Sequence, residues 1–297
     1  MNKSKRKLLL IVGPTGSGKT DLALKTTNPN IEIINGDAMQ LYKEISIGNN
    51  KGKLGVSKLN ELSFYNYTIT PKIVNGINAW LFNLIDVNTE FNIANYQMLA
   101  KKVIEDIYSR KKTPLIVGGS GLYIYSLINN YTFQPHLNNI DRTKSLLQLQ
   151  QDLTNAGFDL NKLNNSDLNN PRRLINYLAK VGSQEVENDL ASESLFDLEI
   201  KLLMPSPEEL RARLEKRIST MLDEGFIAEV ENIISRYGLD NISQMIRNAS
   251  GYKQIFEYLA NRVKLTELKE KILQSHLKLV KKQNTWNKKY FLPLVKN

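Results

Sequence analysis

The sequence of 297 residues contains no cysteine, and histidine occurs only twice. Without cysteine, disulfide frameworks, zinc sites with thiolate ligands and catalysis by a thiol are all excluded. Long apolar runs are missing as well. No stretch approaches the ~18 consecutive apolar residues of a membrane span, and Leu8–Val12 is too short for the apolar centre of a signal peptide. We therefore expect a cytoplasmic protein that does not contact a membrane.

Acidic residues are scarce relative to basic ones, with 30 Asp and Glu against 40 Lys and Arg and a formal net charge of +10. The excess is concentrated in residues 253–297, which hold eleven Lys or Arg against three acids. Such a segment is typical of a protein with a polyanionic partner, although a solvated helix face is the plainer alternative. Trp286 in this segment is expected to pack inward as an anchor rather than to stack on a base.

The first part of the chain contains several short apolar runs. The runs Leu8–Val12, Ile31–Ile34, Asn83–Val87 and Pro114–Val117 predict strands, and the periodicity of Ile93–Arg110 predicts a helix. Strands that alternate with helices favour an α/β fold, in which helices flank a parallel sheet with right-handed crossovers.

The segment Tyr131–Asn170 has a different character, because it has no strand-like run and shows helical spacing around Arg142–Leu153. It predicts a small helical insertion. Helices are also predicted at Pro171–Val181, Pro207–Tyr237 and Leu265–Tyr290. We expect three parts: a P-loop core, first part (1–130), the helical insertion (131–170), and the second part of the core, ending in a basic helical tail (171–297).

Residues 13–20 read Gly-Pro-Thr-Gly-Ser-Gly-Lys-Thr and match the P-loop pattern G-x-x-x-x-G-K-[ST], after a predicted strand and at the start of a helix. In such a loop the backbone N–H groups surround phosphate oxygens, and the helix N-terminus adds partial positive charge. Lys19 supplies a point charge, and the Thr20 hydroxyl is placed to ligate Mg²⁺. The predicted phosphate site consists of Gly13, Thr15, Gly16, Ser17, Gly18, Lys19 and Thr20.

The acid that accompanies the P-loop stands in an unusual place. An NTPase usually has a carboxylate at the end of another buried strand, but Pro114–Val117 is followed by Gly118-Gly119-Ser120. Asp37 instead follows Ile31–Ile34, and ligands of parallel sheets sit at the carboxyl ends of strands. Asp37 should therefore face the P-loop, where it could hold Mg²⁺, cap a loop or act as a general base.

Two arginines downstream share one helix face, because Arg213 and Arg217 are four residues apart. Both could point at a leaving phosphate, where arginine stabilises developing charge. From spacing alone, surface ion pairs with Glu209 or Glu215 are the favoured interpretation.

Taken together, several stretches resemble the bacterial tRNA dimethylallyltransferases (tRNA isopentenyltransferases). Besides the P-loop they are Ile33–Gly48, Pro114–Tyr123, Asn170–Leu174, Arg213–Val230, Gly251–Gln254 and Lys282–Trp286, in the order of that family's motifs. The sequence departs from the family pattern at Asn49, Phe82, Asn83, Asn95 and Asn176.

The resemblance implies transfer of a dimethylallyl group from dimethylallyl diphosphate to N6 of the adenosine immediately 3′ of the anticodon in tRNA. It implies that Asp37 holds and deprotonates the amine, that Thr15 lies beside the reacting centre and that Arg213 assists there. Arg217 joins the P-loop residues in binding diphosphate, and Mg²⁺ is the cofactor. Expected tRNA contacts are Asp37, Ala38, Met39, Gln40, Ser120, Arg172, Arg173, Gly251, Tyr252 and Lys253, with Lys281 and Lys282 of the tail. We expect a monomer.

Three alternatives remain open from the sequence. An isopentenyltransferase acting on free adenine nucleotide would share the P-loop and Asp37, but would need neither the insertion nor the basic tail. A small-molecule P-loop kinase would need a lid rich in arginine, and no arginine occurs between Phe133 and Asp141. A catalytically impaired RNA-binding relative is disfavoured by the intact P-loop.

Overall fold

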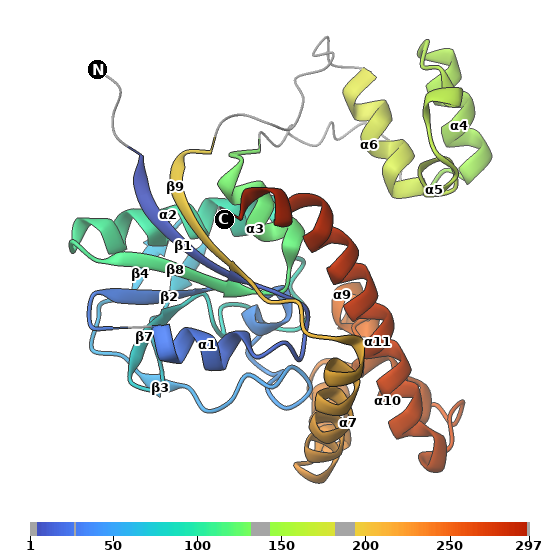
Figure 1. Ribbon diagram of the computed structural model, residues 1–297. Helices are drawn as coiled ribbons and strands as arrows, with labels where there is room; N and C mark the ends of the chain where they lie inside the picture. Colours follow the sequence, from blue (N-terminus) through green and yellow to red (C-terminus); the bar gives the residue numbers. More distant parts are fainter. Residues whose placement is uncertain (1–4, 27, 132–142, 182–193, 296–297) are drawn as a thin grey trace. The chain divides into compact units, whose positions relative to one another are not determined.

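The computed structural model describes residues 5–26, 28–131, 143–181 and 194–295 (Figure 1). These fall into two compact units. The larger comprises Met1–Ile128 and Leu195–Asn297, and the smaller comprises Asn129–Ser194. Among the described residues, no helix is long and apolar enough to cross a membrane.

The larger unit is built on a mostly parallel sheet. Its strands are β1 (Arg6–Val12), β2 (Ile31–Asn35), β3 (Gly55–Val56), β6 (Lys72–Val74), β7 (Ile77–Trp80), β8 (Thr113–Gly118) and β9 (Phe196–Leu202), and a separate hairpin joins β4 (Leu62–Phe64) to β5 (Tyr67–Ile69). The order in the seven-stranded sheet is β3-β6-β7-β2-β8-β1-β9. The five strands from β7 to β9 pair in parallel, and β6 is antiparallel to both of its neighbours. The predicted α/β fold is confirmed.

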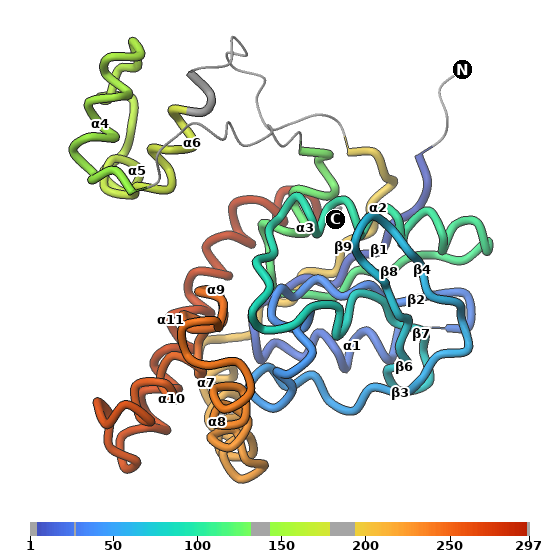
Figure 2. Tube along the Cα trace, turned by 180° about the vertical axis from the view of Figure 1, so that it is seen from behind, coloured from blue at the N-terminus to red at the C-terminus, as the bar shows by residue number. Residues whose placement is uncertain are grey.

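Helices lie on both faces of this sheet, α1 (Lys19–Thr26) on one and α2 (Ile93–Ser109) with α3 (Gly121–Ile128) on the other. The further helices of the larger unit contact mainly one another: α7 (Pro207–Asp223), α8 (Phe226–Tyr237), α9 (Gln244–Arg247), α10 (Tyr252–Leu259) and α11 (Leu265–Tyr290). Side chains of successive β1 residues lie on opposite faces of the sheet. Leu8 and Leu10 join a core with α2 and α3, whereas Leu9 and Ile11 pack with Ala23 of α1. Figure 2 shows α11 running beside α7 and α10.

Three local predictions differ from the structure. The strand predicted at Asn83–Val87 is wrong: the strand is β7, and Leu81 and Asn83 then take positive φ angles of 63° and 51°, which end the ladder. Strand β9 was not predicted, because its apolar residues alternate with charged ones at the sheet edge. The single helix predicted over Pro207–Tyr237 is broken into α7 and α8 by Gly225, whose φ is 96°.

The smaller unit is helical in the part that the structure describes, with α4 (Leu146–Asn155), α5 (Asn165–Leu168) and α6 (Pro171–Val181). Its core contains Leu149 and Leu153 of α4 and Leu174 of α6. Helix α6, expected in the second part of the core, therefore belongs with the insertion, and this unit extends past residue 170. Residues 132–142, which include the segment compared with a kinase lid, lie outside the described residues.

Candidate active site

The P-loop connects β1 to α1 and has the backbone that its glycines permit. Gly16 and Gly18 have φ angles of 79° and 85°, a region that favours glycine. A Cβ on Gly13 would lie 2.7 Å from the Leu203 carbonyl oxygen, so a side chain is excluded there. The loop is closed by hydrogen bonds from Ser17 N to Pro14 O (3.2 Å) and from Lys19 Nζ to Pro14 O (2.8 Å).

Lys19 is held in an environment that disfavours its charge. Burial lowers the pKa of its ammonium group to about 8, and the nearby guanidinium of Arg217 acts in the same direction, while Asp37 opposes both. The same carboxylate opposes the burial that lowers the pKa of Arg217. Asp37, Lys19 and Arg217 are therefore close enough to interact electrostatically, and Asp37 faces the P-loop as the strand rule predicted.

Helix α7 brings both predicted arginines to the P-loop. Arg217 Nη1 donates to Thr15 Oγ1 at 3.1 Å, and its Nε is buried without a hydrogen-bond partner. Arg213 forms the ion pair with Glu209 that spacing favoured, and its Nη1 also lies 3.4 Å from Gly16 O. Arg217 thus contacts the P-loop directly, whereas Arg213 is exposed and lies at the rim of the loop.

Asp37 is the N-cap of the 3₁₀ helix η1 (Ala38–Leu41), and its Oδ1 accepts a hydrogen bond from Met39 N at 3.0 Å. Ala38 N donates to Ser120 Oγ at 2.9 Å, which ties η1 to the turn after β8. That turn also approaches the P-loop, since a Cβ on Gly119 would lie 3.2 Å from Gly13 O and 3.6 Å from Lys19 Nζ. The ends of β1, β2 and β8 therefore form one site.

Gln283 of α11 is a site residue whose position the sequence did not indicate. Its Oε1 accepts from Thr15 N at 2.9 Å, and its Nε2 donates to Gly119 O at 3.0 Å. Trp286, one turn later, packs on Gly121, where a Cβ would come within 2.3 Å of the indole ring. The ring also lies 4.3 Å from that of Tyr290, so Trp286 packs inward as expected of an anchor.

Glu229 of α8 is a second such residue. Its carboxylate accepts from Ser46 N (2.8 Å), Ile47 N (2.7 Å) and Gly48 N (3.1 Å), and from the Tyr252 hydroxyl at 2.8 Å. Together with burial, this carboxylate raises the pKa of Tyr252 well above its ordinary value. Glu229 therefore fastens the turn after η1 to the start of α10.

The residues expected to contact tRNA differ in accessibility. Lys253, Lys281 and Lys282 are exposed, and Ala38, Met39, Gln40 and Ser120 are half-buried around η1 and the β8 turn. Tyr252 is only 1% exposed and bound to Glu229, so it supports the turn from inside rather than presenting a surface. Arg172 and Arg173 are exposed on α6 of the smaller unit, where Arg173 pairs with Asp167.

Three departures from the family pattern have structural partners. Asn49 Nδ2 donates to Met39 O (3.0 Å) and Ile45 O (3.1 Å). Asn83 Oδ1 accepts from the buried ammonium group of Lys51. Asn95 forms a capping box with Asn92 at the start of α2. Phe82 is buried and Asn176 is exposed on α6.

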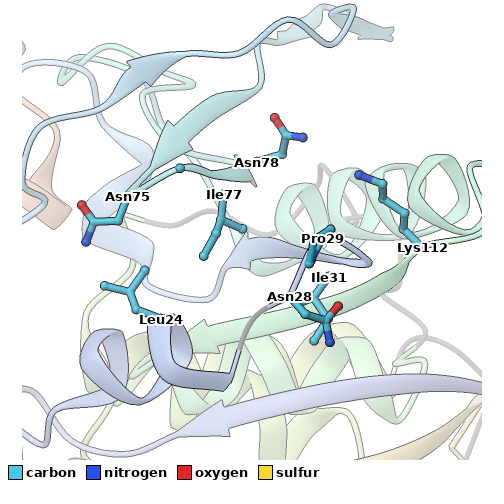
Figure 3. Close-up of a pocket in the computed structure, with 9 residues that line it drawn as sticks. Leu24, Asn28, Pro29, Ile31, Asn75, Ile77, Asn78 and Lys112 are labelled. Atoms are coloured by element: carbon cyan, nitrogen blue, oxygen red, sulfur yellow. The ribbon is translucent and has the colours of Figure 1, made fainter.

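A cavity of about 450 Å³ lies at the other edge of the sheet (Figure 3). It is lined by residues at the end of α1, the start of β2, the β6–β7 turn and the residue before β8, among them Leu24, Asn28, Asn75 and Lys112. Because β2 runs from this cavity towards Asp37, the cavity is separated from the P-loop by the length of the strand.

The described residues contain no cluster of three His, Cys, Asp or Glu side chains that could hold a metal ion. A protein-only metal cage is therefore absent from that part of the chain. The exposed Thr20 at the start of α1 fits a different kind of site, in which Mg²⁺ takes most of its ligands from phosphate oxygens and water.

Fold and site together define a P-loop α/β protein in which a phosphate loop, two arginines and one aspartate converge. The chain belongs to the IPP transferase family, whose model matches residues 60–290. A tRNA dimethylallyltransferase of Bacillus subtilis (strain 168) is 31% identical over 301 residues, covering 96% of this chain and 89% of the relative. One of Acholeplasma laidlawii (strain PG-8A) is 32% identical over 295 residues, covering 98% and 92%.

Solved structures give the same picture. A crystal structure of a tRNA delta(2)-isopentenylpyrophosphate transferase from Staphylococcus epidermidis is similar, with a TM-score of 0.65 and 26% identity over 96% of this chain and 91% of the other. A eukaryotic dimethylallyltransferase acting on tRNA has a TM-score of 0.73 at 24% identity, covering 95% of this chain and 70% of the other. At that identity the second comparison supports the fold alone.

Proposed function

We propose that this protein transfers a dimethylallyl group from dimethylallyl diphosphate to N6 of the adenosine 3′ of the anticodon in tRNA. The observation that carries the proposal is the convergence of Asp37 with Lys19 and Arg217 at one edge of the sheet. A diphosphate leaving group needs cations and backbone donors, and a weakly nucleophilic amine benefits from a carboxylate beside it.

The diphosphate binds along the P-loop from Gly13 to Thr20. Lys19 and Arg217 oppose its charge from inside the loop, and Arg213 does so from the rim. Arg217 Nε, which is buried without a partner, is available to a phosphate oxygen. Mg²⁺, held by the Thr20 hydroxyl, would supply further positive charge at the diphosphate when bound.

In the transfer step the adenosine N6 attacks the allylic carbon that carries the diphosphate. A C–N bond forms, the C–O bond breaks, and the electron pair of that bond leaves with the diphosphate. Asp37 takes the proton from N6, using the carboxylate oxygen that Met39 N does not occupy. The target base must leave the anticodon stack to reach this site.

The tRNA is held through its phosphates by the basic tail. Lys281 and Lys282 are exposed on α11, directly before Gln283, so the same helix reaches both solvent and the P-loop. Lysine is a point charge suited to phosphate. Lys253, Ser120, Gln40 and the arginines of α6 would add further contacts with the RNA.

The decisive experiment incubates the purified protein with Mg²⁺ and radiolabelled dimethylallyl diphosphate, and offers either tRNA or AMP as the acceptor. We expect label in tRNA on adenosine N6 and none in AMP. Label in AMP alone would identify a free-nucleotide isopentenyltransferase. Binding of tRNA without transfer to either acceptor would identify a catalytically impaired relative.

A further inference from the structure

Asn35, the last residue of β2, is a polar residue that is 0% exposed. Its side chain uses both ends of the amide. Oδ1 accepts from Asp37 N at 2.8 Å, while Nδ2 donates to Asp37 O at 2.9 Å and to Leu81 O at 2.9 Å. Its own carbonyl accepts from the buried Tyr96 hydroxyl at 2.9 Å. Asn35 is therefore fixed by its surroundings and in turn fixes the main chain of Asp37 on both sides.

Leu81, whose carbonyl accepts from Asn35, is a buried residue with a positive φ of 63°. A non-glycine residue in this region is strained, and the surrounding contacts must hold it there. The Asn35 amide supplies one of those contacts and joins the end of β7 to the start of η1.

The main chain at Gln40 and Tyr42, at the end of η1, is also held by hydrogen bonds. Asn83 N donates to Gln40 O at 3.3 Å, and the Lys51 ammonium group donates to Tyr42 O and to Asn83 Oδ1. Residues 37–42 are thus held by hydrogen bonds to the buried Asn35 and Lys51 and to the half-buried Asn83. Among the described residues, the Asp37 carboxylate accepts one hydrogen bond, from Met39 N within that turn. Its direction is therefore set by the main chain that Asn35 holds.

We propose that Asn35 is a positioning residue that acts through Asp37: it sets the direction of the carboxylate that receives the proton from adenosine N6. This inference rests on the proposed function, since it takes Asp37 to be the base. A misplacement of about 1 Å can cost on the order of 10²-fold in rate. Asn35→Ala removes the side-chain acceptor of Asp37 N–H and one of the two donors that the described residues supply to Asp37 O, which keeps only Gln40 N. The transfer step should therefore slow by about that factor.

The test is a double-mutant cycle on the single-turnover rate of transfer to tRNA, with wild type, Asn35→Ala, Asp37→Asn and the double variant. If Asn35 acts through Asp37, Asn35→Ala slows the wild type by about 10²-fold but adds little to Asp37→Asn. The dissociation constant for dimethylallyl diphosphate should remain unchanged, because the P-loop is untouched. Equal slowing in both backgrounds, or a normal rate in Asn35→Ala or Asp37→Asn, would overturn the assignment.

Two further variants guard against a purely structural effect. In Asn35→Ser the hydroxyl can accept a hydrogen bond from Asp37 N, as serine does in turns. Its transfer rate should lie below that of wild type and above that of Asn35→Ala. If Asn35→Ala fails to fold, Asn35→Ser still tests the assignment against wild type. Gln97→Leu removes another buried amide, which donates to Ser126 O at 2.8 Å, and should lower the melting temperature without slowing transfer. Wild type that transfers nothing overturns the proposed function together with this inference, whereas active wild type with independent effects overturns the inference alone.

Discussion

Thr15 and Gln283 lie 268 positions apart in the sequence, yet the Thr15 amide donates a 2.9 Å hydrogen bond to the Gln283 side chain. Through its Nε2 the same glutamine reaches Gly119. One P-loop N–H is thus directed at α11 rather than into the phosphate cradle. Hydrogen bonds of Gln283 therefore connect α11, which includes Lys281 and Lys282, directly to the loop that would bind the diphosphate.

Replacing Gln283 by leucine should weaken binding of dimethylallyl diphosphate. Two part-buried groups, Thr15 N and Gly119 O, each lose a hydrogen bond to Gln283, and a net bond contributes about 1 kcal/mol. We expect the dissociation constant to rise on the order of tenfold, which titration calorimetry would measure. Gln274→Leu, on an exposed face of the same helix, is the matched control. Equal affinities of Gln283→Leu and wild type would show that the bridge does not shape the loop.

Affinity for dimethylallyl diphosphate should depend on pH through Lys19. Its pKa in the free protein is lowered to about 8 by burial, with Arg217 contributing. Below pH 8 the ammonium group is already charged and binding needs no proton. Above pH 8 the amine of free Lys19 is neutral, and it must take up a proton when the diphosphate binds to its charged form. The dissociation constant should therefore rise by up to tenfold per pH unit above pH 8.

Lys19→Arg is the control for this pH dependence, because arginine stays protonated over the whole range. Its affinity, although lower overall, should be flat between pH 7 and 9. A wild-type affinity that is equally flat would mean that Lys19 does not titrate in this range.

Lys19→Ala should abolish transfer and leave tRNA binding intact.

Much of this arrangement could be predicted from the sequence, because a P-loop is encoded locally. Gly16 and Gly18 determine its backbone, and the apolar run before Gly13 predicts the strand that leads into it. The position of Asp37 followed from the rule that parallel strands end at one edge. Local patterns sufficed in these cases because the residues that act together are close in the chain.

Other parts could not be predicted, because they depend on tertiary contacts. Nothing near Gln283 or Glu229 in the sequence indicates that one reaches Thr15 and the other three N–H groups of the Ser46–Gly48 turn. The strand predicted at Asn83–Val87 failed because the positive φ of Asn83 belongs to a turn held from outside by Lys51. Asn35 did carry a signal, since an asparagine directly follows the strand run Ile31–Ile34, two residues before Asp37.

Glu229→Gln should destabilise the larger unit. Four donors, three of them backbone N–H groups, converge on its carboxylate. The amide of glutamine would direct its own donors at some of them. Hydrogen bonds to a charged group contribute about 1.5–3 kcal/mol each, so we expect a loss of this order in the free energy of unfolding, measured by urea denaturation. Glu231→Gln, exposed on the same helix, should change it by less than about 0.5 kcal/mol. A wild-type value in Glu229→Gln would show that the carboxylate is replaceable.

Neutralising two lysines of the tail should make tRNA binding less sensitive to salt. Lys281 and Lys282 are exposed on α11 and form no ion pair among the residues that the structure describes. Each phosphate contact releases condensed counterions, so log K falls against log salt concentration by about 0.7–0.9 per contact. Lys281→Ala with Lys282→Ala should therefore flatten that slope by about 1.4–1.8 and weaken binding of all tRNAs alike, since phosphate contacts carry no sequence information.

The measurement is tRNA affinity at several salt concentrations, compared with a second double variant, Lys53→Ala with Lys58→Ala. Those lysines are also exposed but lie outside α11, so the net charge of the two double variants is the same. If both variants flatten the slope equally, the general charge of the protein attracts the tRNA and α11 has no particular role. If neither does, the tail is a solvated face, and the RNA contacts lie around η1 or on Arg172 and Arg173. Dimethylallyl diphosphate should bind all three proteins with the same affinity, because Lys281 and Lys282 point to solvent while Gln283, the next residue, holds the P-loop.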